Sequence, residues 1–340
     1  MPRVTMKKSR LRKAAVLILL FACFLGAFSA IGLWENHQRE QAVASQAQID
    51  DAARRRREGW IEVDGQWYAP RTDLETLLVI GVDKMEPLVS SGSYNNDGQA
   101  DFLLLTIFDK TAKTTTILHI NRDTMTDIPI LGVTGEPAGT IFAQLALAHT
   151  YGDGLEDSCE NTVDAVSMLL GGVKIDHYVG MTMGAVPLLN DMVGGVTVTV
   201  LDDFSGIDDS LVEGETVTLQ GEQALHYVRI RRGLEDSTNL NRMERQQQYL
   251  NALTDQIESL GDDFSPSFSE LDQLSQYIVS DCSVQQLNDL TRRYAGYEMA
   301  EEMLDIKGEA RQGTEFVEYY PDEEALQEQV LSLFYVPKEA

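Results

Sequence analysis

A run of 21 residues without a charged side chain, from Ala14 to Trp34, is the feature that most restricts how this chain can fold. It follows a 13-residue segment that carries six basic and no acidic residues. At about 1.5 Å per residue, a helix over this run is roughly 31 Å long, which matches the ~30 Å hydrocarbon core of a bilayer. The sequence therefore predicts a transmembrane helix over residues 14–34, although a basic start is also typical of a cleaved signal peptide.

The basic tail also predicts the orientation of the chain. Under the positive-inside rule, residues 1–13 form a cytoplasmic tail and everything after Trp34 lies outside, as in a single-pass protein of the cell membrane. The chain has 27 Lys and Arg against 54 Asp and Glu, a net charge of −27, and the part outside the membrane is more acidic still. Because neutralising nucleic-acid phosphates needs the opposite sign, we expect no nucleic-acid partner.

The sequence after the membrane segment divides into three parts. Residues 35–71 are predicted to form a juxtamembrane stalk and a β-hairpin, since Asp64-Gly65 lies between two short alternating stretches. Residues 72–260 alternate apolar, β-branched runs with amphipathic stretches, which predicts a layered α/β domain with a mixed central sheet. Residues 261–340 are predicted to be mainly helical and to pack on or follow this domain.

Two aspartates mark the ends of neighbouring predicted strands. Asp83 ends the apolar run that begins at Leu74, and Asp101 opens the next one. If these strands are antiparallel, both carboxylates lie at the same edge of the sheet, where they are a natural site for Mg²⁺. Taken singly, each aspartate is more typical of a turn or a cap.

Arginines concentrate in a later segment, although the domain is acidic. The segment from Val228 to Arg231 is predicted to leave a helix in an extended conformation. Arg229 and Arg231 are two residues apart, so on this extended segment both guanidinium groups face the same side and suit a pyrophosphate. Arg242 and Gln246 lie one turn apart on a predicted helix. The alternative is that these arginines balance nearby acids in surface ion pairs.

Cysteine and histidine spacing predicts no zinc site. None of the three cysteines forms a CxxC pair, and the five histidines show no HxH or HxxxH spacing. Cys159 and Cys282 are the two cysteines beyond the predicted membrane segment. We expect two separately buried thiols, with a disulfide as the alternative.

Several short blocks, in one order behind the predicted membrane helix, together resemble the LytR-CpsA-Psr family of cell-wall enzymes. The blocks are VIGVD, QADFLLL, HINRDT, LALAHTYGDG, IDHYVGM, LLNDMVGGVTVTV, LQGEQALHYVRIRR and NRMERQQQYL. The resemblance implies a three-layer α/β/α sandwich that holds a polyprenyl chain in an apolar tunnel. It also implies transfer of a phosphate-linked glycopolymer, such as a teichoic acid or capsular polysaccharide, from an undecaprenyl-pyrophosphate carrier to peptidoglycan.

The resemblance also assigns roles to individual residues. It implies that a magnesium ion binds to Asp83 and Asp101, and that the pyrophosphate is bound by Arg122, Arg229, Arg231, Arg242 and Gln246. Two departures from the family pattern concern the same site: Gln99 stands where an arginine is usual, and Asn121 where a proline is usual.

The implied reaction is magnesium-dependent phosphoryl transfer, in which catalysis depends mainly on positioning and charge stabilisation. Arg122 is expected to stabilise charge, and either Asp101 or Asp123 to take the proton of the incoming sugar hydroxyl. Two alternatives stay open. One is a hydrolase or pyrophosphatase acting on lipid-linked envelope precursors, and the other is a non-catalytic regulator that binds polyprenyl-pyrophosphates.

Overall fold

The computed structural model describes residues 53–56, 58–230, 239–260, 267–300, 302–314 and 316–338. This part of the chain divides into two compact units, with boundaries after Pro70 and after Tyr335. The predicted membrane segment 14–34 and the tail before it lie outside the described residues. Within the described ranges, no helix has the length and apolar character needed to cross a membrane.

The first unit is a small sheet built on the predicted hairpin. Strands β1 (Ile61–Val63) and β2 (Gln66–Pro70) are antiparallel, with Val63 opposite Gln66. Asp64 and Gly65 join them at φ angles of 49° and 79°, the left-handed conformation that an Asp-Gly turn provides. A third strand, β16 (Tyr335–Lys338), pairs with β2 from the far end of the chain, which the local sequence did not predict.

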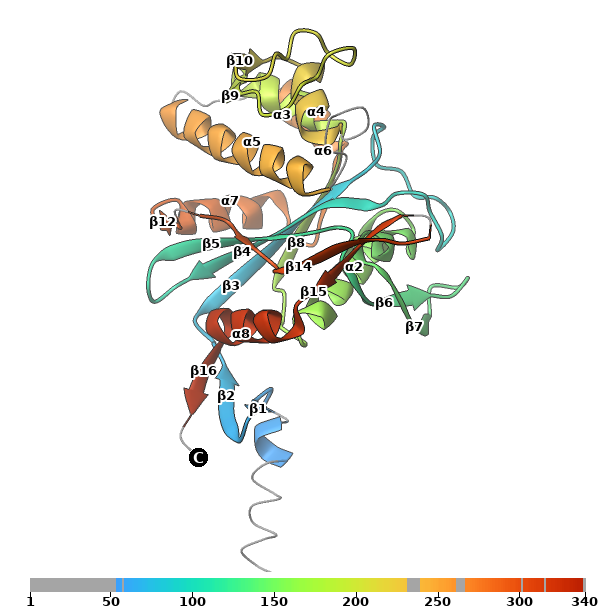
Figure 1. Cartoon of the computed structure of the whole chain (residues 1–340), viewed down its shortest axis with the longest axis vertical. Coiled ribbons are helices and arrows are strands. Elements are labelled where there is room, and N and C mark those ends of the chain that lie inside the picture. Colours follow the sequence, from blue (N-terminus) through green and yellow to red (C-terminus); the bar gives the residue numbers. More distant parts are fainter. Residues whose placement is uncertain are drawn as a thin grey trace, which may run out of the picture. The chain divides into compact units, whose positions relative to one another are not determined.

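The second unit contains a seven-stranded mixed sheet, as predicted (Figure 1). Its order is β11-β8-β3-β4-β5-β12, and β13 also pairs with β5. Strands β3 and β8 are parallel, whereas β3 and β5 both run antiparallel to β4. The strands are β3 (Leu74–Val82), β4 (Ala100–Asp109), β5 (Thr114–Ile120), β8 (His177–Thr182), β11 (Ile278–Ser280), β12 (Glu298–Met299) and β13 (Leu304–Asp305).

Helices cover both faces of this sheet, so the predicted three-layer arrangement is confirmed. Helix α2 (Glu156–Leu169) packs so closely on β8 that a methyl group at Gly180 would lie 2.6 Å from Sγ of Cys159. Helices α3 (Ala185–Met192) and α5 (Asn239–Leu260) border Met181, the next residue of β8. Because consecutive strand residues point to opposite faces, α2 lies on one face and α3 with α5 on the other (Figure 1).

Shorter elements complete the second unit. A hairpin of β6 (Met125–Leu131) and β7 (Pro137–Gln144) leads into a 3₁₀ helix, η1 (Leu145–Thr150). Strands β9 (Val196–Thr199) and β10 (Thr216–Leu219) pair beside α5 and share a buried core with Tyr227 and Phe204. Helix α4 (Glu222–Arg229) continues this layer.

The segment after residue 260 contains strands as well as helices. Its helices are α6 (Phe268–Ser275), α7 (Val284–Tyr294) and α8 (Glu323–Phe334), and a hairpin of β14 (Gly308–Gln312) and β15 (Val317–Pro321) lies between the last two. Strands β11, β12 and β13 extend the central sheet at its edges. These strands are only two or three residues long, so they carry too little periodicity for the sequence to predict them.

Candidate active site

The two strand-end aspartates lie at the same edge of the sheet. Strands β3 and β4 are antiparallel, with Val82 opposite Ala100, and the backbone N–H of Asp83 donates to the carbonyl of Gln99 at 2.9 Å. The sequence prediction that the two strands bring Asp83 and Asp101 to one edge is therefore confirmed. Whether they bind a metal ion stays a prediction.

Asp101 is the centre of a buried ion-pair cluster. Its side chain is only 5% exposed, and it accepts hydrogen bonds from two arginines. Arg122 bonds to Oδ1, and Arg242 bonds to Oδ2 at 3.0 Å. Arg122 is 8% exposed and Arg242 is 3% exposed, so all three groups are removed from bulk water. Buried charges attract one another strongly, and removing one of them leaves its partner as an uncompensated buried charge.

Arg122 is held from three sides. Besides Asp101, it donates to Oε1 of Gln99 at 2.7 Å and to Oδ1 of Asp123 at 3.1 Å. Gln99 thus occupies the position where the family usually has an arginine, and here it accepts a hydrogen bond from the neighbouring guanidinium. A glutamine at this position removes one positive charge but keeps Arg122 oriented.

The turn that presents Arg122 is fixed by Asn121. The side-chain oxygen of Asn121 accepts from the backbone N–H of Asp123 at 2.9 Å, and the backbone carbonyl of Asn121 accepts from the Thr124 hydroxyl at 2.6 Å. An Asn side chain that bonds two residues onward stabilises a turn much as a proline does. The second departure from the family pattern therefore keeps the local backbone shape. Asp123 itself is 2% exposed and is also bonded by Gln144 at 3.1 Å, a contact that no sequence signal indicated.

Arg229 lies at the end of a helix, not on an extended segment. The sequence predicted an extended segment from Val228 to Arg231, but α4 continues through Arg229. The next residue, Ile230, has an extended backbone. Val228 and three other residues of α4 are buried, so packing of its apolar face stabilises the last turn. Arg231 lies outside the described residues, and its pairing with Arg229 stays a prediction.

Arg229 contacts the other strand-end aspartate. Its Nε and one terminal nitrogen both donate to Oδ1 of Asp83, at 3.1 and 2.9 Å. The two side chains are 43% and 36% exposed. This pair is therefore open to solvent, in contrast to the cluster around Asp101.

Helix α5 carries Arg242 and Gln246, one turn apart as predicted, and also Arg245. Arg242 binds Asp101, and Gln246 donates to the carbonyl of Val228 at 3.1 Å, which fixes α5 against α4. Arg245 is fully buried, pairs with Asp202 at 2.8 Å and donates to the carbonyl of Ile230. Arg245 thus holds the exit of α4 in place, a structural role that its spacing did not indicate.

An apolar cavity of about 160 Å³ adjoins this group of side chains. Its wall includes Phe102, which follows Asp101, and Val228, which precedes Arg229. The lining residues come from β3, β4, β8, α3, α4, α5 and the turn between β8 and α3, and are Val79, Gly81, Phe102, Met181, Thr182, Met183, Val186, Leu189, Val228, Gln246, Tyr249, Leu250 and Leu253. The lining of this apolar cavity therefore includes residues that directly neighbour charged residues of the site in the chain.

One buried histidine lies near the charged groups of the site without adding to their charge. His119 lies on β5 beside Phe102, with ring centroids 5.2 Å apart. Burial, together with the positive charge of Arg242, lowers the pKa of His119 to about 4. The imidazole is therefore neutral at physiological pH and adds no charge to the cluster.

Comparison with known proteins places the chain in a family. The model of the LytR_cpsA_psr family matches residues 35–333. The chain belongs to the LytR-CpsA-Psr family. The resemblance inferred from the sequence blocks is thereby confirmed.

Individual family members support this assignment over most of their length. The polyisoprenyl-teichoic acid–peptidoglycan teichoic acid transferase TagU of Bacillus subtilis (strain 168) is 26% identical over 334 residues, which cover 94% of this chain and 96% of TagU. The TagU protein of Halalkalibacterium halodurans is 28% identical over 235 residues, 69% of each chain. A solved structure described as TagT bound to LIIa-WTA has a TM-score of 0.58, with 24% identity and coverage of 77% of this chain and 90% of that one. This last likeness shows a shared fold.

Proposed function

We propose that this family member transfers a phosphate-linked glycopolymer from a polyprenyl-pyrophosphate carrier to peptidoglycan. The observation that carries the proposal is the junction of an apolar cavity with a cluster of arginines. A lipid pyrophosphate has the same two parts, an apolar chain and a compact multiple anion. The activity for which the TagU relatives are named, teichoic acid transfer to peptidoglycan, supports the same class of substrate.

The cavity sets a limit on how the lipid binds in this conformation. A cavity of about 150 Å³ holds a ligand the size of benzene. The space here is similar, about 160 Å³, and therefore accommodates roughly one five-carbon isoprene unit. A longer polyprenyl chain would extend beyond this space.

Arginines of the chain are proposed to bind the pyrophosphate by exchanging partners. In the structure, Arg122 and Arg242 bind Asp101, and Arg229 binds Asp83. A bidentate guanidinium group suits phosphate as well as carboxylate. When the pyrophosphate enters, these guanidinium groups turn from the carboxylates to the phosphate oxygens, and Arg231 is proposed to join them. The released carboxylates then become available for other roles.

The release of Asp101 suggests how the acceptor is activated. The acceptor hydroxyl oxygen attacks the phosphorus that bears the glycopolymer, and its proton passes to a carboxylate. The bond between that phosphorus and the bridging oxygen breaks, and polyprenyl phosphate leaves with the bridging oxygen. Asp101 is the proposed base, and Asp123 the alternative, because Asp123 is also buried and also bound to Arg122.

Magnesium dependence is part of the proposal. Asp83 fits a hard cation, because its carboxylate is 36% exposed and both Arg229 nitrogens bind the same oxygen, Oδ1. Asp101 is proposed as the second ligand once its arginines turn to the phosphate. When bound, Mg²⁺ would supply positive charge to phosphate oxygens. Asp83→Asn removes one proposed ligand of Mg²⁺ and disturbs only an exposed ion pair. Calorimetry with a soluble polyprenyl-pyrophosphate analogue tests this role. Mg²⁺ should increase the affinity of the wild type for the analogue, and this increase should be lost in the variant.

The proposed location is the outer surface of the cell membrane. The support is the predicted helix at 14–34 with its basic tail, together with the acidic composition of the rest of the chain. Protease added to intact cells should remove the domain while a tag before residue 14 stays protected. A mature protein that begins beyond residue 30 would contradict this arrangement.

A transfer assay tests the function itself. The full chain in detergent is incubated with a lipid-linked glycopolymer donor and a peptidoglycan acceptor, and the acceptor-linked product is measured. Arg229→Ala should abolish the product and leave thermal stability within about 2 °C, because an exposed ion pair contributes roughly 0 to 1 kcal/mol. Donor cleavage without acceptor-linked product would indicate a hydrolase, and donor binding without cleavage would indicate a regulator. Either result would refute the proposed transfer.

A further inference from the structure

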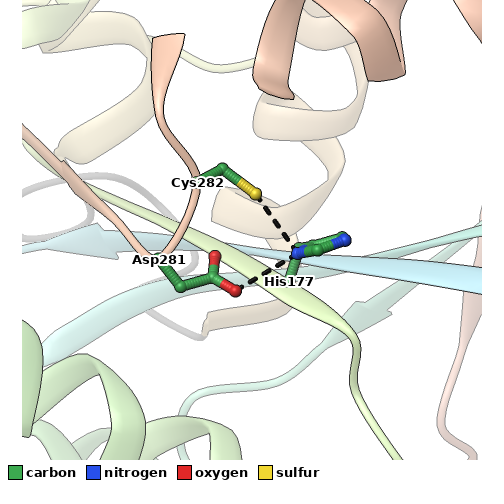
Figure 2. A group of neighbouring side chains, drawn as sticks. All are labelled: His177, Asp281 and Cys282. Atoms are coloured by element: carbon green, nitrogen blue, oxygen red, sulfur yellow. Dashed lines mark hydrogen bonds and ion pairs between the residues drawn. The ribbon is translucent and has the colours of Figure 1, made fainter. Parts of the chain in front are cut away.

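A second group of chemically distinctive side chains lies at the opposite end of β8 from the cavity. His177 begins β8, and Asp281 and Cys282 directly follow β11 (Figure 2). The two strands are antiparallel, with Ser280 opposite Val179, so their pairing brings residues more than 100 positions apart in the chain together. The Nδ1 atom of His177, a carboxylate oxygen of Asp281 and Sγ of Cys282 all lie within 4.8 Å of one another.

The three side chains of this group cannot all form good hydrogen bonds with one another. Nδ1 of His177 lies 3.2 Å from Oδ2 of Asp281 and 3.2 Å from Sγ of Cys282. Figure 2 shows both contacts converging on the same nitrogen. A ring nitrogen has either one hydrogen or one lone pair, so it bonds well to only one of two such neighbours. A cation placed between the three atoms would contact all of them at once.

We propose that His177, Asp281 and Cys282 bind one zinc-like divalent cation, with water as the fourth ligand. Zinc takes nitrogen, oxygen and sulfur ligands at about 2.0 to 2.3 Å, and a tetrahedron with such bonds separates its ligand atoms by roughly 3.3 to 3.8 Å. The two separations from Nδ1 are 3.2 Å and the third is at most 4.8 Å, so metal binding requires side-chain shifts of up to about 1 Å. A thiolate ligand selects zinc or a softer metal over Mg²⁺ and Ca²⁺.

Glu75 is positioned to orient the histidine ligand. Its Oε1 lies 3.8 Å from Nε2 of His177, the nitrogen that faces away from the cluster. Metal-binding histidines commonly donate their second N–H to a carboxylate, which fixes the ring and raises its basicity. Glu75 is itself held by Arg293 at 3.0 Å and by the Tyr294 hydroxyl at 2.5 Å, both on α7. Glu75 is therefore a positioning residue of the proposed site.

The location indicates a structural role. Strand β8 runs from His177 to Thr182, a length of about 16 Å at 3.3 Å per strand residue, and Thr182 pairs with Val82, which directly precedes Asp83. The cluster therefore lies at the opposite end of β8 from the proposed pyrophosphate site. Strand β11 is held to β8 by only three residue pairs, and α7 begins two residues after Cys282. A bound cation would join the end of β11 to the start of β8. Metal binding should therefore stabilise the domain without taking part in the transfer.

Metal titration of the full chain tests this proposal. The protein is purified in detergent under reducing conditions without a polyhistidine tag, with Cys23 replaced by Ala throughout, and is stripped with a chelator. We expect one equivalent of Zn²⁺ to bind, and Co²⁺ used as an optical probe to give a thiolate-to-cobalt charge-transfer band. Saturating Zn²⁺ should raise Tm by roughly 5 °C.

Matched variants identify the ligands. Cys282→Ala should abolish the cobalt band, Asp281→Asn should weaken Zn²⁺ binding about 10- to 100-fold, and Glu75→Gln about 10-fold. Asp281→Asn keeps an oxygen for the Tyr178 N–H, which donates to Asp281 at 3.0 Å, so this variant should fold even if Cys282→Ala does not. Cys159→Ala is the control, because Cys159 is buried with His149 Nε2 at 4.0 Å and, within the described part of the chain, neither is bonded to a carboxylate. Absence of the cobalt band, unchanged affinity in Asp281→Asn, or an equal loss in Cys159→Ala would overturn the proposal.

Discussion

Replacing Asp101 by Asn separates the structural contribution of the buried cluster from its proposed catalytic one. The substitution keeps the shape of the side chain but removes its charge. In the wild type, Arg122 and Arg242 each bond to a different carboxylate oxygen of Asp101. An Asn side chain has one oxygen and one NH₂ group, so one arginine loses an acceptor and faces a donor instead.

The expected cost follows from burial. All three side chains are less than 10% exposed, and removing one partner of a buried ion pair costs about 3 to 5 kcal/mol. For a domain of this size, that corresponds to a decrease in Tm of roughly 6 to 15 °C. Asp83→Asn is the matched control, because it makes the same chemical change in an ion pair whose members are 36% and 43% exposed. Its cost should stay below about 1 kcal/mol.

Thermal unfolding of both variants, followed by circular dichroism in detergent, measures this difference. Both variants are also expected to lose transfer activity, so stability and activity should separate in Asp83→Asn and fall together in Asp101→Asn. A soluble polyprenyl-pyrophosphate analogue should restore part of the stability of Asp101→Asn, because its phosphates replace the lost charge. Equal Tm values for the two variants would refute the assignment of Asp101 as the centre of a buried charge cluster.

Three further predictions concern the cavity, the buried histidines and the packing of α2. Val186→Trp fills the apolar cavity, so it should raise KM for long-chain donors far more than for short-chain analogues; equal effects would contradict binding of the chain there. Burial lowers the pKa of His119 and of His149 to about 4, against ~6.5 when unfolded, so the unfolded state binds more protons between these values. Stability should therefore fall by about 3 kcal/mol per histidine as the pH drops from 6.5 to 4, and urea unfolding that shows no loss over this range would contradict it. Gly180→Ala should destabilise the domain by about 1 to 3 kcal/mol, and Cys159→Ala in the same chain should recover most of the loss; additive effects in a double-mutant cycle would contradict the contact.

The positions of Asp83 and Asp101 at strand ends were predictable because local sequence patterns indicate where the two strands end and begin. The apolar run from Leu74 and the aspartate after it predict where β3 ends, and an antiparallel partner places Asp101 at the same edge. Arg242 and Gln246 were predictable in the same way, since a helix brings residues four apart to one face. The extent of α4 was not, because burial of its apolar face by tertiary packing extends the helix through Arg229.

The partners of the charged groups were beyond sequence reasoning. A strand end indicated Asp101, helical spacing indicated Arg242 and the family resemblance indicated Arg122, but the fold alone brings the two guanidinium groups to one carboxylate. The group of His177, Asp281 and Cys282 shows the same limit more sharply. Motif spacing detects only ligands that are close in the chain, whereas this group depends on the pairing of β11 with β8. Cys159 and Cys282 are free and buried, as expected.

The carboxylates bound to the arginines also act as competitors for any anion that approaches the site. Because they are attached to the same chain, their effective concentration near the guanidinium groups is in the millimolar range or higher. A singly charged anion such as chloride gains too little from displacing them, whereas a pyrophosphate offers several oxygens to Arg122, Arg229 and Arg242 together. The carboxylate-bound arginines thus discriminate by the number of contacts an anion makes at once, and simple salts such as chloride should compete poorly with a multiply charged ligand.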